Sequence, residues 1–313
     1  MGGAFHFNFP DFSFAFLSIL LEGVPFLLLG TVISGLIDQF LSARWMTRLL
    51  PRNPYAGALV SGLLGIIFPM CECGVVPIIR RLMAKGLPPA NAITYMLAAP
   101  VVNPIVALST YAAFRGQAPF DITALRLGVA YVIAVVVGMA VHNLPLRHVL
   151  RPEVIADIAH PQGLAAGGGQ GGIPTRLWGA LAVCVNDFLN MSVYFVFGAA
   201  AAALFNTSVN QEVILPLAMN DWLATGALMA LAATLCLCST TDAFIAATFV
   251  MFPTVSKLAF LVFGPMVDLK LIFIYSAVFR KRFVLGLVVG LFLLVGLICM
   301  RLKVLFALSL TPS

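Results

Sequence analysis

The amino-acid sequence predicts an all-α polytopic membrane protein built from two related halves. Hydrophobic residues make up 61% of the 313 residues and charged residues only 10%, and the mean hydropathy is +1.05. Soluble domains carry about 25% charged residues, so this composition excludes a soluble fold. The apolar stretches are roughly twenty residues or longer, enough to cross about 30 Å of hydrocarbon as helices, and they lack the alternation of an outer-membrane barrel.

A repeat with a constant offset of 165 residues relates the two halves. Cys71 and Cys73 align with Cys236 and Cys238. The other matches in the same register are Pro100 with Pro265, Asn103 with Asp268, and Glu22 with Asp187. Apolar segments match one another easily, but a doubled Cys-x-Cys together with a proline and two polar pairs is hard to obtain by chance.

Each half is expected to contain four apolar segments, two of them interrupted. Unbroken spans are expected at 12–40, 120–146, 176–205 and 283–308. Segments broken at a Cys-x-Cys are expected at 55–85 and 221–252, and segments broken at a proline at 88–114 and 253–279. Between the halves, the Gly-rich composition is typical of a flexible linker. The predicted organisation is a first membrane repeat over 1–150, a cytoplasmic linker over 151–172 and a second membrane repeat over 173–313.

The basic residues distinguish two topologies. If the Cys segments cross the membrane fully, the clusters around Arg48 and Arg81 lie on opposite sides, and the positive-inside signal cancels. If these segments are re-entrant, both clusters face the cytoplasm, each half has three full crossings, and the second half is inverted. Residues 280–282 then face the cytoplasm and Asp221 lies outside. We favour the inverted repeat with broken or re-entrant hairpins over eight plain crossings.

The two Cys-x-Cys motifs form the first candidate site. Pro69 and Gly74 interrupt the first segment, and broken backbone at membrane depth is tolerated only where it is buried in protein or lines a cavity. Symmetry would bring four thiols together, and thiols are soft ligands suited to Cu(I), Zn(II) or trivalent arsenic. Cysteine can also serve simply as a small residue that allows close helix contact. The candidate substrate and metal ligands are Cys71, Cys73, Cys236 and Cys238, with Thr241 as a further substrate contact.

The second candidate site lies at the proline-broken segments, which carry Asn103 and Asp268. Interrupted helices expose carbonyl groups and helix ends that bind ions and polar solutes. Lys270 is the only basic residue expected well inside a segment, and a buried lysine needs a partner. Asp268, Asp242 and Asp187 are the candidates for that partner. A purely structural ion pair is the alternative to a binding role.

Carboxylates within membrane spans are costly and often mark proton or ion pathways. The candidates for a coupling role are Glu22, Asp187, Asp242 and Lys270. Alternatively, Glu22 and Asp187 lie near the membrane interface. The energetic cost of their charges would then be small, and neither would need a coupling role. The sequence contains no ATP-binding or hydrolase motif, so we expect no enzyme activity and no cofactor.

At these motifs the sequence resembles the predicted-permease family that contains the ArsP organoarsenical efflux permeases. The matching segments begin at Glu22, Pro69, Ala98, Asp242 and Gly264 and read Glu-Gly-Val-Pro-Phe, Pro-Met-Cys-Glu-Cys-Gly-Val-Val-Pro, Ala-Ala-Pro-Val-Val-Asn-Pro, Asp-Ala-Phe-Ile-Ala-Ala and Gly-Pro-Met-Val-Asp-Leu-Lys. The resemblance implies a bacterial inner-membrane permease with about eight hydrophobic segments and no ATPase of its own. It also implies efflux of trivalent organoarsenicals with thiols as ligands, although family membership alone does not determine the solute.

Other classes of function remain open on the sequence. The expected activity is transport of a small soft-metal, metalloid or thiol-reactive solute, with proton coupling as a further hypothesis. The alternatives are a membrane thiol-redox enzyme, which usually places two residues between its cysteines, and a channel for a small anion or sulfur compound. The expected partners are the solute and membrane lipid, not nucleic acid, because the basic residues form no groove for a phosphate backbone. Assembly into a homo-oligomer is also open.

Overall fold

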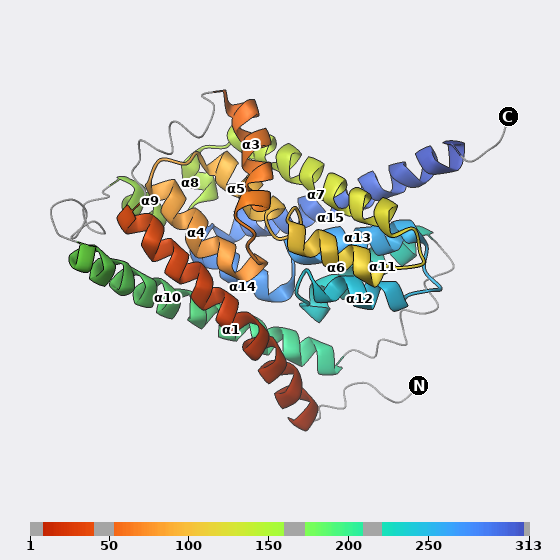
Figure 1. Ribbon diagram of the computed structural model, residues 1–313, viewed down its shortest axis with the longest axis horizontal. Helices are drawn as coiled ribbons and strands as arrows, with labels where there is room; N and C mark the ends of the chain where they lie inside the picture. Colours follow the sequence, from red (N-terminus) through yellow and green to blue (C-terminus); the bar gives the residue numbers. More distant parts are fainter. Residues whose placement is uncertain (1–8, 41–52, 160–172, 209–220, 310–313) are drawn as a thin grey trace.

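The computed structural model describes residues 9–40, 53–159, 173–208 and 221–309, and the regular elements in these ranges are helices (Figure 1). The first half contains α1 (Phe9–Phe40), α3 (Pro54–Ile67), α4 (Glu72–Ala84), α5 (Pro89–Ala98), α6 (Pro104–Ala113) and α7 (Pro119–His142). The short helices α8 (Leu146–Val149) and α9 (Pro152–Ala159) follow. The second half contains α10 (Ile173–Ser208), α11 (Asp221–Leu235), α12 (Thr241–Thr248), α13 (Thr254–Met266), α14 (Leu269–Val278) and α15 (Lys281–Ser309).

The lengths and surfaces of the helices fit a membrane protein. Within the described ranges, five stretches are long and apolar enough to cross a bilayer: Phe9–Phe40, Pro119–His142, Pro174–Thr207, Thr254–Val278 and Lys281–Leu302. Large apolar side chains, including Phe14, Leu21 and Leu285, are exposed on the outside, where hydrocarbon rather than water would meet them. The predicted all-α polytopic fold is confirmed.

The predicted interruptions of the apolar segments are also present. The helix breaks lie between Ile67 and Glu72, between Leu235 and Thr241, around residues 99–103, and at Val267 and Asp268. Prolines favour the new starts, because α3, α5, α6 and α7 all begin at a proline, a residue suited to the first turn of a helix. The orientation of the second half relative to the first stays a prediction.

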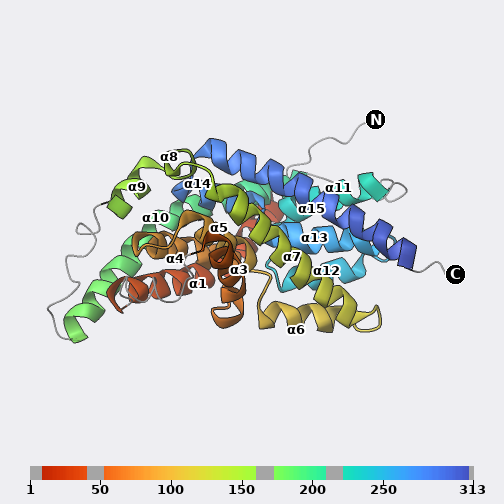
Figure 2. The same cartoon turned by 90° about the horizontal axis from the view of Figure 1, so that it is seen from above.

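The helices are arranged around a buried pair of inner helices. In the first half, α5 lies between α3 and α7, and in the second half α13 lies between α11 and α15. The long helices α1 and α10 run side by side on the other flank, as both views show (Figures 1 and 2). Across the halves, α4 contacts α14 and α12 contacts α6. The helix breaks of each half therefore lie against the other half.

The segment between the halves is not irregular throughout. Pro152–Ala159, within the predicted linker, forms α9 and contacts α4. Its Pro152 suits a helix start, and Val154 is buried in the core. Residues 160–172, which hold all the glycines of this linker, lie outside the described residues.

The crossing of α1 and α4 depends on two glycines. A Cβ atom added at Gly30 would lie 2.5 Å from the Cα atom of Gly74, a distance that real Cβ atoms do not tolerate. Small residues allow such close backbone approach in membranes. We expect Gly30→Val to separate α1 from α4 and to destabilise the protein by about 1–3 kcal/mol, the usual cost of overpacking. Thermal unfolding in detergent measures this cost.

Gly128→Val is the matched control for this change. It lies on α7, where an added Cβ would meet no atom within 4 Å. The control should unfold close to the wild-type temperature. Equal unfolding temperatures for the two variants would contradict the close-contact role of Gly30.

Candidate functional site

The Cys-x-Cys motifs lie at the helix breaks, as the prolines and polar residues around them predict, although Cys73 itself belongs to the first turn of α4. Cys71 precedes the first residue of α4 in extended conformation, and Cys236 follows the last residue of α11. Cys236 has a φ of 52°, a left-handed conformation that costs energy for any residue except glycine. The carbonyl oxygen of the same residue, Cys236, accepts a hydrogen bond from Lys270 Nζ at 2.9 Å.

Asn103 and Asp268 occupy equivalent positions as N-caps of the helices that follow the second pair of breaks. Asn103 Oδ1 accepts a hydrogen bond from the Val106 N–H at 2.9 Å. Asp268 Oδ1 accepts one from the Leu271 N–H at 2.7 Å. Both side chains are buried. Their first role is to satisfy N–H groups at the buried start of a helix.

Lys270 is the centre of a buried charge cluster. Its Nζ lies 3.4 Å from Glu72 Oε1 and 3.4 Å from Asp268 Oδ2. All three side chains are at most 5% exposed. Within the described residues, Glu72 Oε2 and Asp268 Oδ2 accept no hydrogen bond. One ammonium group therefore serves two carboxylates. Both oxygens of Asp268 are occupied, by Lys270 and by the Leu271 N–H, whereas Glu72 Oε2 is the oxygen that a solute or a proton can use.

The four paired cysteines lie near this charge cluster. Cys73 and Cys236 are buried, and both lie within electrostatic range of Lys270 and Asp268. Cys71 and Cys238 lie within electrostatic range of each other, and Cys71 is only partly buried. All four are free thiols. The breaks of both halves thus place thiols and charges in one region.

The thiols do not form a ready-made metal site in this conformation. In the ranges that the structure describes, no group of three Cys, His, Asp or Glu side chains is close enough to hold a metal ion. Metal ligation by the four cysteines stays a prediction, and it would require them to move closer together.

A second buried ion pair joins α7 to the start of α12. Arg126, which is fully buried, donates to Asp242 Oδ2 at 2.7 Å and to the Ser239 carbonyl oxygen at 2.9 Å. It also donates to Thr110 Oγ1 at 2.8 Å. The guanidinium group therefore connects α7, α6 and the Cys-x-Cys break of the second half.

A third buried ion pair links α4 to α10. Arg81 Nη2 lies 2.7 Å from Asp187 Oδ1, and Ser34 Oγ donates to Asp187 Oδ2 at 2.9 Å. Asp38 Oδ1 lies 3.9 Å from Arg81 Nη1 and 3.8 Å from Lys85 Nζ. Asp187 is therefore buried and paired with Arg81, and its depth in the membrane stays a prediction.

Two predicted residues lie apart from these ion pairs. Glu22 is half-buried within α1 and lies within electrostatic range of Cys238. Thr241 is exposed at the first turn of α12. The structure therefore places Glu22 beside the cysteine region, whereas Thr241 faces away from protein contacts.

Comparison with known proteins places the chain in a family. Residues 9–304 match the ArsP_1 family, described as predicted permeases. The chain belongs to the ArsP_1 family of predicted permeases. It is 36% identical over 283 residues to UPF0718 protein YcgR of Bacillus subtilis (strain 168), covering 90% of this chain and 93% of that protein. It is also 34% identical over 281 residues to a putative two-component membrane permease complex subunit of Streptococcus mutans, covering 87% of this chain and 88% of that protein.

No solved structure matches the chain. Membership of a permease family, together with several apolar helices, makes this ArsP_1 permease a multi-pass bacterial membrane protein. The family and the Streptococcus mutans relative are both named as permeases, and this agrees with a transporter rather than an enzyme.

The ion pairs of the permease correct two expectations. Lys270 is not the only basic residue inside the bundle, because Arg126 and Arg81 are buried as well. Of the three proposed partners of Lys270, only Asp268 lies beside it. Asp242 pairs with Arg126 and Asp187 pairs with Arg81. Each carboxylate pairs with a cation on a helix that its own helix contacts. The positions of the residues along the chain do not show which helices are in contact.

Sequence reasoning also missed three members of the buried ion pairs, namely Glu72, Arg126 and Arg81. Glu72 lies inside the first Cys-x-Cys motif, but it has no carboxylate at the equivalent position of the second half, where Leu237 stands. Arg126 lies between Leu125 and Leu127 in an otherwise apolar span, and such an isolated charge is itself a signal. Arg81 lies in a run of basic residues, and such a run is typical of the membrane surface rather than of a buried ion pair.

Proposed function

We propose that this permease moves a small soft-metal, metalloid or thiol-reactive solute across the inner membrane, by way of the region where its broken helices meet. The observation that carries the proposal is the position of four free thiols around the Glu72, Asp268 and Lys270 cluster. Soft thiols suit trivalent arsenic or Cu(I), whereas the carboxylates and the lysine suit a polar or charged group of the same solute.

Cys71 is the best candidate for the first contact with the solute. It is the only one of the four paired cysteines that is not fully buried. The other three lie deeper, and Cys73 and Cys236 stand next to the charge cluster. A solute would pass from Cys71 to the buried thiols as the helix breaks rearrange, with Asn103 and Asp268 holding the starts of α6 and α14.

Proton coupling in this proposal is assigned to the Lys270 cluster. Two carboxylates share one lysine there, so protonation of either Glu72 or Asp268 leaves one ion pair intact. Asp187 is poorly suited to the same task, because Arg81 and Ser34 hold it firmly. Asp242 and Glu22 are the remaining coupling candidates.

In this proposal the two halves form an inverted repeat with the boundary in 151–172. They move relative to each other during transport. Three of the buried ion pairs, Arg81–Asp187, Arg126–Asp242 and Lys270–Glu72, each join a residue of the first half to one of the second. Alternating access then requires the halves to rock against each other around a central site. The name of the Streptococcus mutans relative adds a second membrane subunit as a candidate partner.

Replacement of the paired cysteines tests the thiol role. Cys71→Ser with Cys73→Ser should lower transport of a trivalent organoarsenical into inside-out vesicles at least about tenfold, because a hydroxyl oxygen is a hard, weak ligand for soft metals. Uptake is measured at equal protein level in the membrane, with Cu(I) and thiosulfate as further probes. Counterflow in liposomes separates a carrier from a channel.

The matched control replaces cysteines that have no counterpart in the repeat. Cys184→Ser with Cys299→Ser changes two buried thiols outside the cluster and should leave transport close to wild type. Equal transport by both double variants would reject thiol ligation, and the binding site would have to be sought among Glu72, Asp268 and Lys270 alone.

A further inference from the structure

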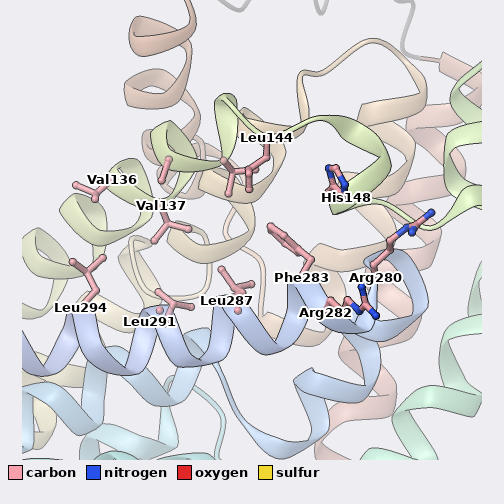
Figure 3. Close-up of a pocket in the computed structure, with 14 residues that line it drawn as sticks. Val136, Val137, Leu144, His148, Arg280, Arg282, Phe283, Leu287, Leu291 and Leu294 are labelled. Atoms are coloured by element: carbon pink, nitrogen blue, oxygen red, sulfur yellow. The ribbon is translucent and has the colours of Figure 1, made fainter.

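A groove of about 590 Å³ lies between α7 and α15, away from the cysteines (Figure 3). One wall comes from α7, with Val136, Val137 and Val141. The other comes from α15, with Leu287, Leu291 and Leu294. In Figure 3 the labelled residues Val137, Leu287 and Leu291 lie along the space between the two helices. The groove is thus a hydrocarbon-lined space on a membrane helix pair.

Two glycines of α15 keep the groove open. A Cβ atom added at Gly286 or Gly290 would meet no atom within 4 Å. Both glycines line the groove, as does the small residue Ala140 on α7. The space is therefore wide enough to accept a side chain or a hydrocarbon chain without displacing protein atoms.

One end of the groove is basic. Arg280, Arg282 and His148 lie there, at the turn where α15 begins (Figure 3). Arg280 is held in place, because its N–H donates to the Val149 carbonyl oxygen at 3.0 Å and its Nε to that of Leu150 at 3.3 Å. Among the described residues, no carboxylate forms an ion pair with Arg280 or Arg282. These charges are available to an anion.

The length of the groove fits one leaflet of a bilayer. Its α15 wall runs from Phe283 to Leu294, which is about 16 Å at 1.5 Å per residue. Half of a hydrocarbon core of about 30 Å is roughly 15 Å. A transmembrane helix of a partner would need a groove about twice as long, whereas one acyl chain needs this length.

We propose that this groove binds a phospholipid with an anionic headgroup, its acyl chain lying between α7 and α15 and its phosphate contacting Arg280 and Arg282. Arginine suits this role because its planar guanidinium can donate two hydrogen bonds to one phosphate. Basic pockets between membrane helices recognise anionic headgroups in the same way. The occupied groove would brace the last span of each half against the other.

Lipid binding to the delipidated full-length protein tests the proposal. In detergent, native mass spectrometry should show phosphatidylglycerol binding roughly tenfold more tightly than phosphatidylcholine with the same acyl chains. Arg280→Gln with Arg282→Gln should remove this preference. Arg301→Gln, with Arg115→Gln, makes the same change of charge at exposed sites outside the groove and should preserve the preference. If the double variant does not fold, Arg282→Gln alone should reduce the preference.

A groove-filling variant separates the acyl chain from the headgroup. Gly290→Leu, on α15, should weaken binding of both lipids severalfold. Gly128→Leu, on α7 and outside the residues that line the groove, is also at an open position and should not weaken it. Glycerol phosphate without acyl chains should fail to displace the bound lipid at equal concentration. Equal binding of the two lipids, a preference that survives loss of both arginines, or full competition by glycerol phosphate would each overturn the proposal.

Discussion

Lys270→Met is expected to abolish transport and to destabilise the protein by about 3–5 kcal/mol, the usual cost of removing one partner of a buried ion pair. The change would leave Glu72 and Asp268 facing each other without the ammonium group that now lies 3.4 Å from each. The Cys236 carbonyl oxygen would also lose its hydrogen bond. Size-exclusion profiles after heating in detergent measure the loss of folded protein.

Neutralising the whole cluster separates folding from transport. Lys270→Met combined with Glu72→Gln and Asp268→Asn should restore folding, because no buried charge is left unpaired. Asparagine can keep the helix cap of α14, since Asn103 caps α6 in the same way. The triple variant should nevertheless remain inactive. Lys281→Met, at an exposed lysine, is the control for the loss of a positive charge. Wild-type stability of Lys270→Met would show that the cluster is not needed for folding.

Arg126→Leu is expected to have an effect of similar size. Arg126 is fully buried and makes close contacts with Asp242, Ser239 and Thr110. Its loss would leave the Asp242 carboxylate buried beside the second Cys-x-Cys break, at a cost of about 3–5 kcal/mol. Arg115→Leu, at an exposed position, should cost less than about 0.5 kcal/mol. Unfolding temperatures of the two variants give the comparison.

A compensating change distinguishes a structural pair from a coupling pair. Arg126→Leu with Asp242→Asn should fold at least as well as Arg126→Leu alone, because the unpaired carboxylate is removed. If this double variant transports with an unchanged response to a pH gradient, Asp242 is a structural residue. If transport persists only as exchange, Asp242 belongs to the coupling pathway. No recovery of stability would contradict the assigned ion pair.

The positions of the helices follow from local sequence. The span expected at 12–40 is Phe9–Phe40 in the structure, and the one expected at 120–146 is Pro119–His142. Apolar runs of membrane-spanning length form helices because backbone groups in hydrocarbon must be satisfied within the segment. Prolines and polar residues near the Cys-x-Cys motifs end those helices through local geometry. The positions of the helices and of their breaks can therefore both be predicted from each segment by itself.

The roles of the predicted site residues depended on contacts between distant segments. Asn103 and Asp268 were expected to bind solute, and the structure shows both as helix caps, with Asp268 also beside Lys270. The sequence marks each as a polar residue at a break. Whether such a residue caps a helix, pairs with a charge or contacts a solute depends on what lies opposite, and α4 and α14 meet only in the folded protein.

The sequence by itself determined that this is a helical membrane protein, where its helices break, and which thiols lie at the breaks. Its organisation as two repeats stays a prediction. Only the tertiary structure decided the partners of the buried charges. Arg126 and Asp242 are 116 residues apart, and Arg81 and Asp187 are 106 apart. A charged side chain within the membrane needs a partner of opposite charge, and the sequence offers several candidate partners for each one. The contacts between helices select one, because an ion pair forms only where two helices bring the side chains within a few ångströms.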